Sequence, residues 1–305
     1  MDSLSTANVE FCLDMFKELN NNNVGDNIFF SPLSLLYALS MILLGARGNS
    51  AQQVEKVLHF NHIAESLKPE FKGSAKCSHA GRIHSEFGVL FSQIIQPDSN
   101  YTLSIANRLY GTKAMSFHQG KSVIVEMMYQ TGTFKLAFIK EPQMQVLELP
   151  YVHKKLSMII LLPAGTAALE QVEKQLSVKT FHKWTSSSNM VESEVEVHLP
   201  RFKLEIKYEL NSLLKSLGMT DVFNQVKADL SGISPDKGLH LSKVIHKSYV
   251  DVNEEGTEAA AATGDNLVLK RLPIRAKFMA NRPFLFFIRH LDTNTILFCG
   301  KLASP

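Results

Sequence analysis

The chain has 305 residues, of which 45% are hydrophobic and 20% are charged, and its formal net charge is +3. This composition is typical of a globular protein with enough apolar material for a large core. The small net charge gives no reason to expect binding to nucleic acid or to a membrane surface. No apolar run reaches the roughly eighteen residues that predict a membrane-spanning helix.

The N-terminus lacks the basic start and apolar run of an ordinary secretory signal. The three cysteines, Cys12, Cys77 and Cys299, are an odd number and lie far apart. This usage fits free thiols in a reducing compartment. The sequence therefore predicts a cytoplasmic protein, and release by an unconventional route stays open.

The N-terminal part of the chain is predicted to be helical. Apolar residues at helical spacing predict a first helix over 9–19, and residues 27–32 read as a short strand. Residues 31–48 are apolar on nearly all sides, so we expect a central, buried helix. Ser31 can cap this helix, and Gly45 or Gly48 can end it.

Further helices and a loop are predicted before the middle of the chain. Residues 49–60 favour a helix capped by Asn49 or Ser50. Residues 62–83 are polar and mixed, which predicts a mobile loop. Helical spacing returns over residues 84–95, and residues 101–112 read as a strand.

The second half of the chain is predicted to be mainly strand. Residues 146–163 hold two apolar runs joined by a polar turn, and residues 195–210 alternate on both sides of Pro200. Residues 243–252 read as a strand, and residues 282–302 as a buried hairpin. Because helices come first and strands later, we expect one intermixed α+β domain over residues 1–305.

Motifs for catalysis, nucleotide binding and metal binding are incomplete. Gly120–Ser122 ends like a phosphate-binding loop, but Met115 stands where that motif requires glycine. His59 and His62 are three residues apart without further ligands, and no nucleophile elbow of a serine hydrolase occurs. We therefore expect no enzyme activity, no metal and no cofactor.

Several stretches together resemble one family. "NEEGTEAAAAT" at 253–263, a basic pair and the C-terminal "RPFLFFIRH" to "LASP" resemble the reactive-loop hinge and final hairpin of a serpin. Residues 27–48 resemble the early strand and buried helix of that family, and residues 147–163 match it further. The resemblance is to the ovalbumin-like, intracellular clade B, and it covers essentially every residue present.

This resemblance implies a serpin fold, with N-terminal helices, mixed and antiparallel sheets and an exposed reactive loop. It also implies inhibition of serine proteases by a suicide-substrate mechanism, in which the cleaved loop inserts into the large sheet as a new strand. Gly256 would permit the backbone change at the hinge. The hinge residues implied by the resemblance are Glu255, Gly256, Thr257, Glu258, Ala259, Ala260, Ala261, Ala262 and Thr263.

The resemblance also implies the bait and the partner. Counting along the usual loop length from Gly256 places the scissile bond after Lys270, or after Arg271 if the count slips by one. Either residue fits a trypsin-like protease, which holds a basic side chain against a carboxylate. Ser31 and His246 match residues under the point where the large sheet opens. We expect a monomer whose partner is a trypsin-like protease, with no nucleic acid or membrane partner.

The chain departs from the family at Gln119–Gly120. A typical serpin domain is larger than most protein domains. This chain is roughly eighty residues shorter than such a serpin domain. The missing part implied by the resemblance includes the long central strand beside the insertion site, an edge strand and the helix that covers them. We interpret this as an internal deletion, from a splice form or a partial gene model. Two functions stay open: a protease inhibitor and a non-inhibitory serpin.

Overall fold

The computed structural model describes most of the chain outside three long intervals. The described residues are 3–22, 25–61, 63, 75–94, 126–151, 154–186, 188–235, 238–253 and 275–304. The predicted strand at 101–112 lies outside them.

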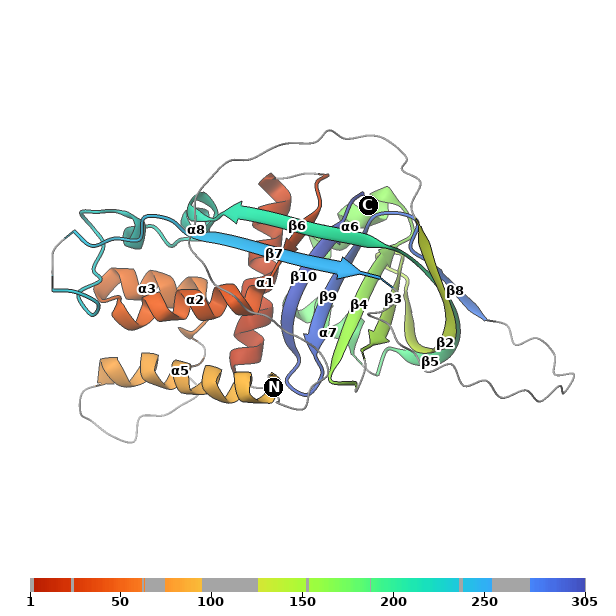
Figure 1. The fold of residues 1–305 in the computed structure, drawn as a ribbon, viewed down its shortest axis with the longest axis horizontal. Coiled ribbons are helices and arrows are strands. Elements are labelled where there is room, and N and C mark those ends of the chain that lie inside the picture. The colour runs from red at the N-terminus through yellow and green to blue at the C-terminus, as the bar shows by residue number, and fades with distance from the viewer. Residues whose placement is uncertain are drawn as a thin grey trace, which may run out of the picture.

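Four helices and one short strand form the described N-terminal part of the chain. They are α1 (Ser3–Asn22), β1 (Ile28–Phe30), α2 (Pro32–Gly45), α3 (Gly48–Val57) and α5 (Ala75–Ile94). In Figure 1, α2, α3 and α5 lie to one side of the strands, while α1 runs close behind them. The helix α2 is capped by Ser31 and begins with proline, as the sequence predicts.

The main sheet has eight strands in the order β1-β10-β9-β4-β3-β2-β5-β8. The members besides β1 are β2 (Met127–Ile139), β3 (Met144–Pro150), β4 (Leu156–Pro163), β5 (Val191–Pro200), β8 (Ala276–Met279), β9 (Phe284–His290) and β10 (Thr295–Leu302). The predicted hairpins at 146–163 and 282–302 are confirmed as β3–β4 and β9–β10.

A separate two-stranded sheet runs across the main sheet. It consists of β6 (Phe202–Glu209) and β7 (Ile245–Val252), paired antiparallel along their full length. Figure 1 shows this β6–β7 ribbon crossing in front of β9, β10 and β4. Its inner side chains, such as Leu204 and Val252, are buried against Phe286 and other residues of the main sheet.

Alternation along the central strands creates two cores. On β9, Phe286 belongs to the core under the β6–β7 ribbon, whereas Phe287 belongs to the core that also contains the helices. Successive residues of a strand point to opposite faces, so one sheet supplies both cores. The remaining short helices are α6 (Thr166–Gln175), α7 (Val178–Thr185) and α8 (Asn211–Ser216), followed by the 3₁₀ turn η2 (Asp221–Phe223).

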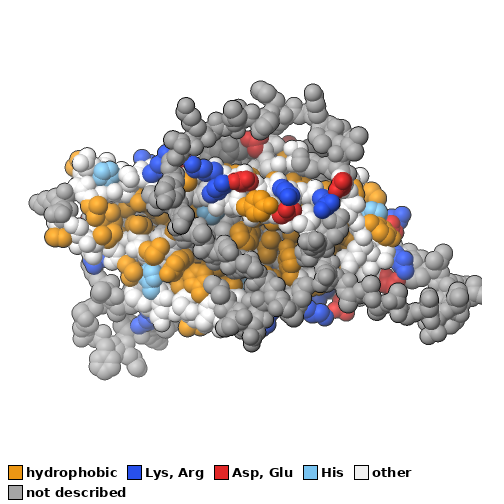
Figure 2. All heavy atoms as spheres, viewed as in Figure 1, with side chains coloured by type: hydrophobic (Ala, Val, Ile, Leu, Met, Phe, Trp, Pro, Cys, Tyr) orange, Lys and Arg blue, Asp and Glu red, His pale blue; other side chains and the backbone are white. Residues whose placement is uncertain are grey.

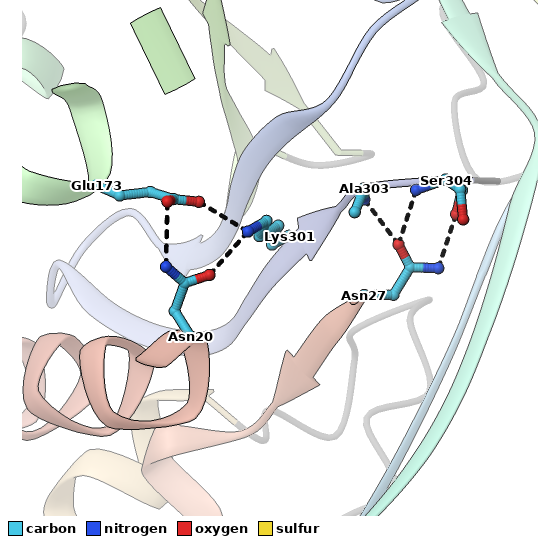
Figure 3. Close-up of polar contacts among 6 residues, drawn as sticks. All are labelled: Asn20, Asn27, Glu173, Lys301, Ala303 and Ser304. Atoms are coloured by element: carbon cyan, nitrogen blue, oxygen red, sulfur yellow. Dashed lines mark hydrogen bonds and ion pairs between the residues drawn. The ribbon is translucent and has the colours of Figure 1, made fainter. Parts of the chain in front are cut away.

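Partly buried polar contacts join the N-terminal helix to the C-terminal strand, as Figure 3 shows. Lys301 Nζ on β10 lies 2.9 Å from Glu173 Oε1 on α6 as an ion pair, and it donates a 2.7 Å hydrogen bond to Asn20 Oδ1 on α1. Asn20 Nδ2 donates to Glu173 Oε2 at 3.1 Å. Nearby, Asn27 Oδ1 accepts from the backbone of Ala303 and Ser304. These contacts connect elements far apart in the sequence.

Two local predictions are wrong. The predicted loop at 62–83 is helical from Ala75 onward, because α5 begins there and packs Ile83 and Phe87 into the core. The predicted cap of α3 is also wrong: Arg47 precedes the helix, without a side-chain cap bond, and Asn49 and Ser50 lie inside it. Ser50 Oγ instead accepts from the backbone N–H of Asp229, so tertiary packing decides its role.

Candidate functional site

The predicted bait and hinge fall between two strands of the structure. The strand β7 ends at Val252 and β8 begins at Ala276, so the intervening chain connects the ribbon to the edge of the main sheet. Lys270, Arg271 and the hinge residues 255–263 lie outside the described residues. Their assigned roles stay predictions.

Ser31 and His246, which the sequence assigned to one region, are in direct contact. The backbone N–H of Ser31 donates a 3.0 Å hydrogen bond to Nε2 of His246. The Ser31 hydroxyl donates to the Leu297 carbonyl at 2.8 Å and accepts from the Ser34 N–H at 3.2 Å. One residue therefore ties together the start of α2, the strand β10 and the β6–β7 ribbon.

The contact with Ser31 requires a neutral His246. Nε2 can accept the Ser31 N–H only through its lone pair, so the ring proton of the neutral form resides on Nδ1. His246 is only 6% exposed, and its burial lowers its pKa from 6.5 to about 4. At neutral pH the ring is a hydrogen-bond acceptor without charge, which suits a structural role.

Two further side chains of the ribbon make similar bonds to β1. The Ser248 hydroxyl donates to the carbonyl of Phe29 at 2.6 Å, and the N–H of Phe29 donates to the Tyr208 hydroxyl at 3.2 Å. Burial raises the pKa of Tyr208 to about 12. With His246, these residues satisfy the backbone of Phe29 and Ser31 on the side of β1 that faces away from β10. We call Tyr208, His246 and Ser248 the β1 clasp.

The contact of Ser248 and the clasp role of Tyr208 were not predicted from the sequence. A signal was present, because His246 and Ser248 are two residues apart and so share one strand face. Tyr208 lies directly opposite His246 in the register of β6 and β7. What the sequence could not supply was the partner strand, which is more than two hundred positions away for Ser248.

The ribbon edge that adjoins the hinge has no neighbour among the described residues. The strand β7 pairs with β6 alone, and the two form a sheet of two strands. Lys203 and Asp251 form a 2.8 Å ion pair across it. An extended segment added beside β7 would therefore find one described strand to pair with instead of two.

Hydrophobic side chains gather on the face below this ribbon. Figure 2 shows them over the region of α2, α5 and the nearby strands, beneath the charged side chains of the ribbon. On α2, Met41 and Leu44 are 43% and 41% exposed, and Val89 on α5 is 57% exposed. Large apolar side chains exposed on a monomer in this way mark a surface that another element could cover.

A small pocket lies where β7 ends. It has a volume of about 40 Å³ and is lined by Tyr151, Leu199, Asp251, Val252 and their neighbours. Ligand sites in proteins usually measure about 300–1,000 Å³. The pocket is therefore too small for a substrate or cofactor and does not suggest small-molecule chemistry.

The described part of the chain holds no cluster of three metal-binding side chains. His59 instead contacts two carboxylates of α1, with 2.8 Å from Nε2 to Asp14 and 3.4 Å from Nδ1 to Glu10. No helix in the described ranges is long and apolar enough to cross a membrane.

Comparison with known proteins identifies the family. The model of the family "Serpin (serine protease inhibitor)" matches residues 6–120 and 112–305. The chain is 62% identical to Serpin B11 of Homo sapiens and 50% identical to Serpin B11 of Mus musculus, with all of both chains covered in each comparison. These are similar clade B proteins, in agreement with the resemblance seen in the sequence.

Solved structures agree with the family match. Uncleaved ovalbumin superimposes with a TM-score of 0.73 at 28% identity, covering 99% of this chain and 100% of that one. A structure described as a tumour suppressing serpin also gives a TM-score of 0.73, at 27% identity with full coverage of both chains. The predicted α+β serpin fold is confirmed.

The same comparisons confirm an internal truncation. The family model matches in two parts, which meet at residues 112–120, around the predicted break at Gln119–Gly120. The alignment with human Serpin B11 extends over 392 positions, although this chain has 305 residues. The chain therefore belongs to the serpins, a family of protease inhibitors and not of enzymes, and it lacks an internal stretch of its relatives.

Proposed function

We propose that this chain presents a basic bait to trypsin-like serine proteases and is cut there without trapping the protease. The bait is Lys270, or Arg271 if the count along the loop is one residue longer. Lysine and arginine both fit a specificity pocket with a carboxylate at its base. The protein acts as one domain in the cytoplasm, in keeping with its clade.

The observation that carries this proposal is the isolation of the β6–β7 ribbon. Trapping by a serpin depends on insertion of the cleaved loop as a new strand in a sheet. A strand inserted beside β7 gains a ladder of backbone bonds on that side, each worth about 0.5–1.5 kcal/mol. Among the described residues no strand is available on its other side. The second ladder is lost, and with it much of the free energy that drives trapping.

The runner-up is an inhibitor that does trap its protease. The hinge favours it, because Thr257, Ala259, Ala261 and Thr263 are small residues at period two, as an inserting strand requires. A hinge of this kind permits insertion, but it does not replace a missing neighbour strand. The two-stranded β6–β7 sheet therefore favours a chain that is cleaved as a substrate over one that traps its protease.

Incubation of the purified chain with trypsin separates the two functions. We expect rapid cleavage after Lys270 or Arg271, identified by mass spectrometry of the C-terminal fragment, and no SDS-resistant complex on a gel. A variant with Lys270→Ala and Arg271→Ala should resist this first cleavage. First cuts outside residues 253–275 would contradict the bait, and a stable covalent complex would contradict the loss of trapping.

A further inference from the structure

The first half of β2 has an open edge. Residues 127–136 pair with β5, whereas pairing with β3 begins only at Lys135 and continues to Ile139. No described strand pairs with the β3-facing side of residues 127–134. Beside Met127 to Phe134, the main sheet as described therefore ends in a strand that has no described neighbour on one side.

The hydrogen bonding of Glu126 defines which backbone groups are free. The N–H of Arg201, at the end of β5, donates to the Glu126 carbonyl at 2.9 Å, so residue 126 faces β5. Backbone groups alternate sides along a strand, so residues 128, 130, 132 and 134 also face β5. The N–H and C=O groups of Met127, Tyr129, Thr131 and Thr133 face the open side. All four of these residues are exposed, and Tyr129 is 60% exposed.

This edge lacks the protection that other open edges of the molecule have. The free side of β1 is covered by the β1 clasp. The strand β6 carries a charged residue at every second position, β7 carries Lys247 and Asp251, and the four-residue β8 contains Lys277. Charges, prolines and short length are the usual means by which proteins keep edge strands from pairing. Residues 127–134, "MMYQTGTF", contain neither a charge nor a proline.

We propose that this edge of β2 pairs with the same edge of a second copy of the chain. The pairing is antiparallel and related by a two-fold axis at Gln130. Free backbone groups must face free groups, so Met127 pairs with Thr133 of the second copy and Tyr129 with Thr131 of the second copy. This register uses all four open residues of each strand. It gives an isologous dimer in place of the expected monomer.

Self-pairing is favoured by the character of the strand itself. The segment has no charge, so a second copy introduces no like-charge repulsion along the paired strands. On the exposed face Tyr129 lies beside Thr131 of the second copy, an aromatic and β-branched pair that stabilises antiparallel strands. The small net charge of +3 opposes association only weakly. A second copy of the chain also carries the same strand, so the pairing partner is as abundant as the protein itself.

Amide hydrogen exchange at single residues tests the register directly. In the dimer, the amides of residues 127, 129, 131 and 133 are protected together with those of 128, 130, 132 and 134. In a monomer only the second set is protected, because only those amides bond to β5. Light scattering over a range of protein concentrations measures the mass in parallel. A monomer at all concentrations, with fast exchange at the first set, overturns the proposal.

Two matched variants connect association to this edge. Thr131→Lys adds a charge at the paired edge, and Val191→Lys adds the same charge at a 66%-exposed position of β5 opposite Leu136. We expect Thr131→Lys to weaken association about tenfold or more, equivalent to a loss of about 1.4 kcal/mol. Val191→Lys should leave association unchanged. An equal effect of both variants, or no effect of Thr131→Lys, overturns the proposal.

A cysteine at the two-fold axis provides a second measurement. In this register Gln130 faces Gln130 of the second copy as a non-hydrogen-bonded pair, with Cα atoms about 4.5 Å apart. That distance permits a disulfide. In a Cys77→Ser background, mild oxidation should link Gln130→Cys into covalent dimers but leave the control Val191→Cys monomeric. Equal cross-linking of the two cysteines would overturn the register. Neither result depends on the response to trypsin.

Discussion

A buried histidine connects the ribbon to the start of the central helix. His246 accepts a hydrogen bond from the Ser31 N–H, and it does so because burial keeps its ring neutral. A protonated ring has no lone pair at Nε2 and could not accept this bond. The contact therefore depends on pH.

The pH dependence of stability follows from the depressed pKa of His246. Its pKa is about 4 in the folded protein and 6.5 as a free side chain. Between these values the unfolded chain binds a proton that the folded protein does not, so the free energy of unfolding falls as pH falls from 6.5 to 4. The loss should reach about 3 kcal/mol, since one pKa unit equals about 1.36 kcal/mol. Urea unfolding at several pH values measures it.

A neutral acceptor in place of His246 provides the control. His246→Gln retains an oxygen that can accept the Ser31 N–H but cannot be protonated in this range. It should flatten the pH dependence between 6.5 and 4. His240→Gln, which changes a partly exposed histidine bonded to Gly238, should retain the slope of the parent. An unchanged slope in His246→Gln would show that other groups cause the effect.

At the scale of elements, the β1 clasp holds an edge strand and a ribbon together. The strand β1 has only three residues, and it pairs with β10 on one side. On its other side, hydroxyl and imidazole groups of the ribbon take the place of a neighbouring strand. Buried backbone groups need such partners, since an unpaired one costs about as much as a lost hydrogen bond. The clasp therefore stabilises both elements.

Tyr208→Phe tests the clasp. The variant removes the acceptor of the Phe29 N–H without creating a cavity, so a buried donor loses its partner. We expect a loss of about 1–3 kcal/mol in the free energy of unfolding, measured by denaturant titration. Amide exchange should become faster at Phe29 than at Phe30, which faces β10 instead. Tyr249→Phe, on the exposed face of the same ribbon, is the matched control. Slow exchange at Phe29 in Tyr208→Phe would contradict the bond.

At the scale of the whole molecule, the isolated ribbon limits what cleavage can release. Loop insertion into a complete sheet would raise the thermal stability of the cleaved protein, because a new strand becomes paired. Here the strand next to the hinge has one neighbour among the described strands, and Figure 2 shows hydrophobic side chains below it. Typical domains have total stabilities of only about 5–15 kcal/mol, so such losses matter.

We expect little change in melting temperature after cleavage in the loop. Thermal unfolding of the intact and trypsin-cut chain, followed by circular dichroism, measures the difference. The two melting temperatures should agree to within a few degrees, since about 1 kcal/mol corresponds to roughly 2–4 °C even in somewhat smaller domains. A large rise after cleavage would mean that another segment replaces the missing neighbour strand.

The sequence by itself determined the local structure wherever one face of an element is strongly apolar. The helix after Ser31, the hairpins β3–β4 and β9–β10 and the alternation around Pro200 are all as predicted. Periodicity suffices there because burial of one face selects one structure and one register. Motifs of the hinge and the C-terminus also identified the family.

Only the tertiary structure decided which residues act together. Polar residues such as Ser50 and Ser248 have no periodic signal, because their role depends on a partner distant in sequence. The cap of α3 and the start of α5 were mispredicted for the same reason. Open edges are likewise not predictable from a sequence. That β2 has one side without a described neighbour, and that β7 has one described neighbour, follows from how strands assemble and not from their own residues.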